Sequence, residues 1–267
     1  NMMRHSTHCR SLHIRHPKDK VSLAENFLYM MQGPRSYSDL DVKILDLALI
    51  LHAEHGGGNN STFTVRVTSS SETDTYSSIA AGIGSLKGPL HGGANLQVVD
   101  MLEHLKEAIS DWTDAAELDA YLQKMLNKEV YNKTGKIYGI GHAIYTISDP
   151  RALLLKEMAR KLAEEKGLQK EFAFLELIEN RAIETFMNFK GERINKQVCV
   201  NVDFYSGFVY DAIGLPREVY TPLFAMSRIA GWTAHRIEEL NFASKRIIRP
   251  AYKNVGGKKE FIPLQKR

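Results

Sequence analysis

The sequence has only two cysteines among its 267 residues, Cys9 and Cys199, and they are far apart. Such a pattern excludes a disulfide framework, argues against a cysteine-based zinc site and fits a reducing compartment. No apolar run is long enough to cross a bilayer. No apolar signal core follows the first residues either. We therefore expect a cytoplasmic protein without a membrane partner.

A strong excess of one charge is also missing. The chain carries 35 Lys and Arg against 31 Asp and Glu, a formal net charge of +4. This excess is too small to call for nucleic acid, although it suits anionic substrates. Residues 1–20 are basic and rich in histidine, but no aromatic residues interleave to stack on bases, so we interpret them as a solvated, irregular segment. We expect no nucleic-acid partner.

The sequence shows no alternating strand pattern, no repeats and no low-complexity tract. Apolar residues instead recur at helical spacing in most of the chain. The predicted helices cover residues 22–31, 39–55, 95–110, 114–125, 150–162, 170–189, 201–214 and 221–240. Residues 61–85 are rich in Ser, Thr, Ala and Gly, which predicts closely packed helices. The expected fold class is all-α.

Three polar segments interrupt these helices. In the first, His91 stands between Gly88-Pro89 and Gly92-Gly93, where glycine permits sharp, left-handed turns and close approach to a ligand. A plain interhelical loop with an incidental histidine is the alternative. The second segment contains Gly139, Gly141 and His142, and the third Asn201 and Asp203. Because no strand precedes Gly139 and no third glycine follows, the pattern is a weak match to a dinucleotide-binding loop.

Charged residues near helix ends complete the set of candidates. Asp149-Pro150 is typical of a helix start, which places Arg151 in the first turn, where an arginine and a helix N-terminus can together face a carboxylate. Arg228 is the one charge in an apolar helical stretch, and a buried arginine needs an anionic partner. His52 and His55 could form a metal pair, but no third ligand is evident, so we expect no metal. Arginines suit a substrate with two carboxylates, and a carboxylate with histidines suits proton removal beside a carbonyl.

These segments resemble the citrate synthase family in order and spacing. The resemblance rests on Gly88-Pro-Leu-His-Gly-Gly-Ala-Asn95, Gly139-Ile-Gly-His-Ala143 with Asp149-Pro-Arg151, Asn201-Val-Asp-Phe-Tyr-Ser-Gly207 and Phe224-Ala-Met-Ser-Arg-Ile-Ala-Gly-Trp232. It runs from about Asp39 to Pro250. It implies an all-α homodimer that condenses acetyl-CoA with oxaloacetate and water to give citrate, in the tricarboxylic acid cycle. Acetyl-CoA is then a co-substrate, and no tightly bound cofactor is expected.

The resemblance also implies a role for each matching residue. Asp203 resembles the base that removes a methyl proton from acetyl-CoA, His91 the group that hydrogen-bonds the thioester oxygen, and His142 the residue that polarises the ketone of oxaloacetate. The other implied oxaloacetate and citrate ligands are His55, Arg151, Arg228 and Arg249, the last of which would reach in from the partner subunit. The implied coenzyme A contacts are Ile137, Gly139, Gly141 and Lys196.

The family pattern further implies two domains, with a small domain at residues 92–208 between large-domain parts at 1–91 and 209–267. Family chains are longer on the N-terminal side, so we predict an incomplete large domain with bare apolar faces, and no activity for this chain alone. A 2-methylcitrate synthase, which uses propionyl-CoA, differs by one methylene in an acyl pocket and remains an alternative. A non-catalytic dimerisation fragment is the alternative from another class, although every main catalytic position is present.

Overall fold

The computed structural model describes residues 1–8, 11–141, 145, 147–191 and 198–266, and within these ranges the chain is built from helices. The predicted all-α fold is confirmed. The longer elements are α2 (Leu23–Met31), α3 (Asp39–His52), α4 (Asn60–Ser69), α5 (Thr75–Leu86), α6 (Ala94–Ala108), α7 (Ala115–Leu126), α8 (Pro150–Lys166), α9 (Gln169–Lys190), α10 (Asp203–Ile213) and α11 (Tyr220–Asn241). Short helices are α1 (Met2–His8), η2 (Arg217–Val219) and η3 (Leu264–Lys266).

Helix starts follow their capping residues. Asp149 accepts a hydrogen bond from the Arg151 N–H, and Pro150 is the first residue of α8, as predicted. Asp114 likewise caps α7, and the sequence Asp114-Ala-Ala-Glu117 has the pattern of a capping box, but only half of the box forms, because Glu117 accepts from the Ser110 and Asp111 N–H groups. Residues 1–20 were expected to be irregular, but Met2–His8 form the short helix α1. The helix expected over residues 39–55 ends earlier, at His52.

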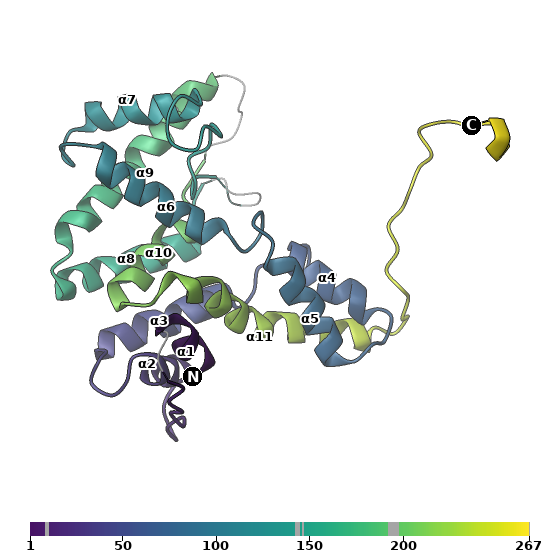
Figure 1. Cartoon of the computed structure of the whole chain (residues 1–267), viewed down its shortest axis with the longest axis horizontal. Coiled ribbons are helices and arrows are strands. Elements are labelled where there is room, and N and C mark those ends of the chain that lie inside the picture. The colour runs from purple at the N-terminus through teal and green to yellow at the C-terminus, as the bar shows by residue number, and fades with distance from the viewer. Residues whose placement is uncertain (9–10, 142–144, 146, 192–197, 267) are drawn as a thin grey trace.

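Two groups of helices share α11, as Figure 1 shows. In the larger group, α6 to α10 pack together and rest on α2 and α3, with one continuous apolar core. In the smaller group, α4 and α5 pack against the C-terminal half of α11 around Val65, Leu86 and Trp232. Because Tyr220 and Leu223 belong to the larger core, α11 ties the two groups together. The region between the two groups is therefore the place where α11 passes from the larger core to the smaller one.

The expected domain boundary at 208/209 falls inside α10, which is continuous from Asp203 to Ile213. Helix α10 packs on α6 and α8, and α3 also packs on α8. The division into 1–91, 92–208 and 209–267 stays a prediction. Its small-domain range contains α6 to α9 and the first half of α10.

Residues 61–85 pack as closely as their small side chains predict. A Cβ atom built on Gly82 of α5 would lie 2.6 Å from Cγ2 of Val65 in α4, whereas one on Gly84 meets nothing within 4 Å. Two glycines of one helix thus differ in whether they have room for a methyl group.

We expect Gly82→Ala and Gly84→Ala to change stability in opposite directions. Overpacking against the buried Val65 should lower the free energy of unfolding by about 1–3 kcal/mol. Gly84→Ala has space and removes backbone freedom from the unfolded chain, so it should raise that free energy by about 0.4–1 kcal/mol. Urea denaturation followed by circular dichroism measures both. Equal effects would contradict the close packing of α4 and α5.

After α11 the chain runs outward in an extended segment, residues 242–263, which leaves the body in Figure 1. Its first part is held by the Lys245–Glu72 ion pair at 3.0 Å and by the Ile248 N–H, which donates to Ser70 Oγ at 3.0 Å. Beyond these contacts almost every residue is exposed.

Candidate active site

A cavity of about 40 Å³ lies where α3, α6, α10 and α11 meet. It brings together His91 and Asp203, which are 112 positions apart in the chain. Its other lining residues are His52, Gly92, Ala94, Asn95, Tyr210, Tyr220, Thr221 and Phe224. The convergence of His91 and Asp203 was the central expectation from the sequence. His142, the third predicted member, lies outside the described residues.

The turn that carries His91 depends on glycine, although not through left-handed backbone as expected. None of Gly88, Gly92 and Gly93 has a positive φ. A Cβ atom on Gly92 would instead lie 2.2 Å from the Leu86 carbonyl oxygen. The turn is also held by Thr221, whose hydroxyl donates to the Gly92 carbonyl at 3.1 Å. A Cβ atom on Gly93 would likewise lie 2.8 Å from the Pro89 carbonyl oxygen, so Gly92 and Gly93 are required for close backbone approach, and this approach fixes where the His91 ring sits.

His91 is held by Ser61 at the start of α4. The Ser61 N–H donates to His91 Nε2 at 3.3 Å, and the Ser61 hydroxyl lies 2.9 Å from the same nitrogen. Burial and the positive charge of Arg228 lower the pKa of His91, so the ring is neutral at pH 7. With Nε2 accepting a hydrogen bond, the ring hydrogen belongs on Nδ1. We infer from this a neutral ring whose Nδ1–H is available as a donor.

Asp203 begins α10, and its backbone N–H is capped by the Asn201 side chain at 3.0 Å. Burial raises the pKa of Asp203 to about 6, even though Arg151 and Arg228 act in the opposite direction. A carboxylate with this pKa is mostly ionised at pH 7, yet is a stronger base than an ordinary aspartate. The raised pKa of Asp203 therefore suits this carboxylate to proton abstraction.

Arg228 is buried in the middle of α11, as its apolar surroundings predicted. Its guanidinium donates to the His52 carbonyl at the end of α3 and, at 3.4 Å, to Asn59 Oδ1. Burial is the main reason that its pKa falls to about 10, so it remains a cation at pH 7. Among the described residues no carboxylate lies within 4.0 Å of it, although a buried cation needs an anion. That anion can be supplied by a bound ligand.

Arg151 is fixed by Asp149, which is almost fully buried. The Asp149 carboxylate accepts from Arg151 Nε at 3.0 Å and from its terminal nitrogen at 2.8 Å, and also from the Val202 N–H at 3.2 Å. The Asp149 carboxylate thus links Arg151, which the resemblance implies to be a substrate ligand, to the backbone N–H of Val202, one residue before Asp203.

Replacing Asp149 with asparagine should lower the free energy of unfolding by about 2–4 kcal/mol, because it leaves the Arg151 guanidinium without its charged acceptor in a buried position. Thermal or urea denaturation of the chain measures this. The matched control is Glu157→Gln on the same helix, whose pair with Lys161 is exposed and should contribute under about 0.5 kcal/mol. If the free energy of unfolding fell no more than in the control, Asp149 would not be needed to hold Arg151 and Val202 in place.

Two other predicted ligands lie away from the cavity lining. The His55 ring is beside Tyr145, at 6.4 Å between ring centroids, and Tyr145 also lies 5.7 Å under the Arg151 guanidinium carbon. His55 and Arg151 thus share Tyr145 as a neighbour, and His55 does not line the cavity that His52 lines. Arg249 is exposed in the C-terminal extended segment, so within one chain it is not part of the site.

The predicted coenzyme A loop pairs with the segment that leads to Asp203. Ile140 and Val200 form an antiparallel bridge, and the Gly141 N–H donates to the Cys199 carbonyl at 2.8 Å. Gly139 has a φ of 80° and packs against Phe204, while the Ile137 side chain is buried in the core. Their role toward coenzyme A stays a prediction, and Lys196 lies outside the described residues.

The cavity also contains polar atoms that sequence reasoning missed. Among the described residues, six buried side-chain atoms lack a hydrogen-bond partner, and three of them belong to residues that line this one cavity: His52 Nδ1, Asn95 Oδ1 and Tyr210 OH. Burial, followed by the charges of Arg228 and Arg151, lowers the pKa of His52 to about 3, so it is neutral. Such unsatisfied atoms are costly unless a ligand bonds to them. Asn95 stood in the His91 segment and His52 was considered only as half of a metal pair, whereas Tyr210 lies among apolar core positions.

Metal chemistry finds no support in these side chains. Within the described part of the chain, no group of three His, Cys, Asp or Glu residues could hold a metal ion. His52 lines the cavity while His55 lies beside Tyr145, so the two histidines do not form a pair of ligands in this structure.

Among the described residues, no helix is both long and apolar enough to span a membrane.

In the described part of the chain, a carboxylate of raised pKa and a neutral imidazole line one cavity, and the buried guanidinium group of Arg228 bonds to the backbone of His52, which also lines it. This arrangement defines the class of acid–base sites that suit anionic ligands. Comparison with known proteins identifies the family. The family model described as "Citrate synthase, C-terminal domain" matches residues 1–251, and the chain belongs to the citrate synthase family.

Individual relatives agree with this assignment. The chain is 43% identical over 254 residues to a citrate synthase of Acidithiobacillus ferridurans, covering 94% of this chain and 60% of that protein. It is 36% identical to a 2-methylcitrate synthase of Shewanella oneidensis, covering 93% and 60%. The ternary complex of Thermoplasma acidophilum citrate synthase with carboxymethyl coenzyme A and oxaloacetate matches with a TM-score of 0.75 at 30% identity, covering 96% and 63%. The chain thus spans about 60% of the length of these curated relatives.

Proposed function

We propose that this chain carries the catalytic residues of a citrate synthase, which condenses acetyl-CoA with oxaloacetate and, after hydrolysis, yields citrate and coenzyme A. The observation that carries the proposal is the cavity shared by His91 and Asp203, which also holds three unsatisfied polar atoms and has a buried cation, Arg228, at its edge. The family membership and the substrate-bound Thermoplasma acidophilum relative support it.

Asp203 takes a proton from the methyl group of acetyl-CoA in this scheme. Its pKa of about 6 makes it ionised and basic at neutral pH. As the proton leaves, negative charge develops on the thioester oxygen, and the Nδ1–H of neutral His91 is the donor that stabilises it. The resulting enol carbon attacks the ketone of oxaloacetate to give citryl-CoA, and water then cleaves the thioester.

The guanidinium groups hold the carboxylates of oxaloacetate and citrate. Arg228 and Arg151 supply two of them, with His55 close to Arg151, and His142 polarises the ketone. Arg249 of a second copy completes the site in a homodimer, which suits its exposed place in the C-terminal extended segment. Backbone groups around Ile137, Gly139 and Gly141, with Lys196, contact coenzyme A. No tightly bound cofactor takes part.

Closure of the 92–208 domain over the substrates would exclude water while the enol exists. The construction of the cavity supports such motion, because its lining residues come from both sides of the expected boundary: Asp203 from α10 and Phe224 from α11. The boundary itself remains part of the proposal.

A 2-methylcitrate synthase, which would use propionyl-CoA, is the second candidate. The Shewanella oneidensis relative favours it, at an identity comparable with several citrate synthases. The two activities differ by one methylene, which a pocket discriminates by about 1–3 kcal/mol.

A thiol-release assay tests both. The complete gene product is mixed with oxaloacetate and either acetyl-CoA or propionyl-CoA, and coenzyme A release is followed with a thiol reagent. We expect oxaloacetate-dependent release with kcat/KM higher for acetyl-CoA. A preference for propionyl-CoA would establish the second candidate. No oxaloacetate-dependent release from either thioester would refute the proposal and leave a non-catalytic dimerisation role.

A further inference from the structure

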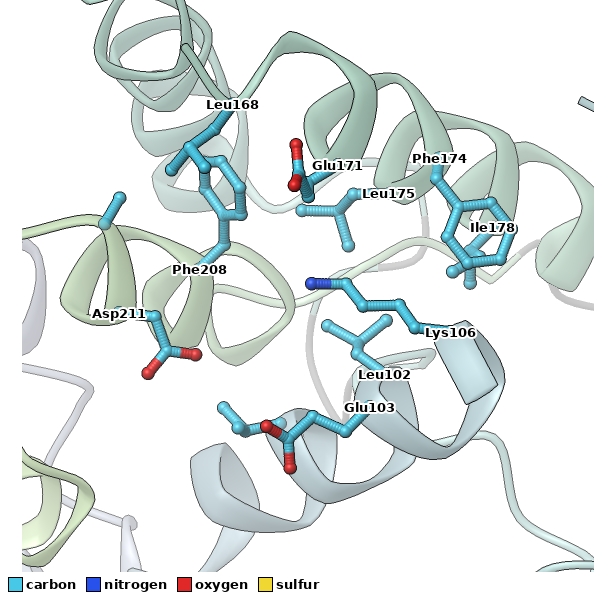
Figure 2. Close-up of a pocket in the computed structure, with 12 residues that line it drawn as sticks. Leu102, Glu103, Lys106, Leu168, Glu171, Phe174, Leu175, Ile178, Phe208 and Asp211 are labelled. Atoms are coloured by element: carbon cyan, nitrogen blue, oxygen red, sulfur yellow. The ribbon is translucent and has the colours of Figure 1, made fainter. Parts of the chain in front are cut away.

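A second pocket, of about 260 Å³, lies between α6, α9 and α10, away from the His91–Asp203 cavity. Figure 2 shows the side chains of these three helices that line it. Its walls are mainly apolar and come from Val99, Leu102, Leu168, Phe174, Leu175, Ile178, Phe208 and Ala212. Pockets for drug-sized ligands measure roughly 300–1,000 Å³, so this one suits a smaller molecule with an apolar body.

One cation points into this pocket. In Figure 2 the Lys106 side chain extends inward, with its ammonium group between the walls made by α6 and α9. Among the described residues Lys106 makes no ion pair within 4.0 Å. The hydrogen bond from Arg217 is the main cause that lowers the pKa of Glu103, and the charge of Lys106 adds a smaller effect there and on Asp211, so Lys106 lies near both carboxylates. An apolar ligand alone would desolvate this ammonium group without replacing its water, which is unfavourable.

Three carboxylates line the pocket, and they differ in their partners. Glu103 is already neutralised by Arg217, which donates through both terminal nitrogens. Glu171 and Asp211 form no ion pair within the described residues, and Asp211 accepts only the neutral Tyr220 hydroxyl. A purely anionic ligand would be repelled by these two groups, and a purely cationic one by Lys106.

We propose that this pocket binds a free α-amino acid with a large apolar side chain, such as leucine or phenylalanine. The ligand's carboxylate pairs with Lys106, its ammonium group with Glu171, and its side chain fills the space lined by Leu175 and Phe208. Each charge of such a zwitterion meets its opposite, and the apolar part meets apolar walls. The binding does not depend on the proposed catalytic function.

Isothermal titration calorimetry of the complete gene product tests the proposal with L-phenylalanine and L-leucine. We expect a dissociation constant below about 1 mM. N-acetyl-phenylalanine, which lacks the cation, and phenylalanine amide, which lacks the anion, should each bind at least ten times more weakly. No heat of binding for either amino acid, or equal affinity for the acetylated form, would overturn the proposal.

Two substitutions in the pocket distinguish a specific binding site from weak nonspecific binding. Lys106→Met and Glu171→Gln should each weaken phenylalanine binding at least tenfold, while thermal denaturation confirms that both remain folded. Lys124→Met, an exposed lysine on α7 outside the pocket, is the matched control and should leave affinity unchanged. Affinity that survives both pocket substitutions would refute the assignment, even if citrate formation is found.

Discussion

Replacing Asp203 with asparagine should slow citrate formation by the complete gene product about 10²–10⁴-fold or more, because general-base catalysis is lost. The amide has nearly the same shape, so the affinity for oxaloacetate should change little. Coenzyme A release gives the rate, and calorimetry gives the affinity. Asp100→Asn, an exposed carboxylate on α6, is the control and should retain full activity.

The pH dependence follows from the pKa of about 6. Only the ionised form of Asp203 can accept the proton, so kcat/KM should fall as pH drops through about 6. Stability should change in the other direction. The folded pKa lies above the ordinary value of 3.8, so the folded state binds this proton more tightly, and the free energy of unfolding declines as pH rises from about 4 to 6.

The asparagine variant has no such proton and no buried charge. At pH 7.5 it should therefore be more stable than the wild type by about 1–3 kcal/mol, while being far less active. A variant that lost both activity and stability would indicate damaged packing and would not support the role of Asp203 as a base.

Arg228→Met should weaken oxaloacetate binding at least about 10²-fold, since charge-assisted bonds to a desolvated carboxylate are worth about 2–5 kcal/mol. The same change should leave stability equal or higher. The guanidinium is buried without a carboxylate among the described residues, and methionine fills a similar apolar volume. Calorimetry with oxaloacetate and urea denaturation give the two quantities.

A second buried arginine on the same helix supplies the contrast. Arg236 donates to Ser69, Ser78 and Thr75 hydroxyls and to the Thr73 carbonyl, so its hydrogen bonds are satisfied by the protein itself. Arg236→Met should lower the free energy of unfolding by about 2–4 kcal/mol, because several buried oxygens lose their donor. Oxaloacetate affinity should be retained. If the two variants behaved alike, Arg228 would be a structural residue.

Much of this arrangement follows from local chemistry. Asp149-Pro150 and the spacing of apolar residues predict where α8 begins and how far α9 and α11 run, because caps and periodicity act over a few residues. The convergence of His91 and Asp203 could not come from spacing. It came from the resemblance, since two turns more than a hundred residues apart are joined only by tertiary packing.

The missed residues show where local reasoning ends. His52 and Tyr210 sit on helix faces that are otherwise apolar, so their pattern is that of core positions. Whether a buried polar group has a partner depends on the opposite wall of the cavity, which belongs to other helices. The support of His91 by Ser61 is equally invisible, because it joins a loop to a helix start thirty residues earlier.

The course of residues 242–263 away from the rest of the chain bears on how many copies one active site needs. The segment is tethered near Ser70 and Glu72 and then leaves its own body, carrying Arg249 with it. Under the proposed function, Arg249 of each copy completes the active site of the other copy. A mixed dimer of one chain altered at Asp203 and one altered at Arg249 should then contain one intact site, and its activity would show that the dimer is the smallest active unit.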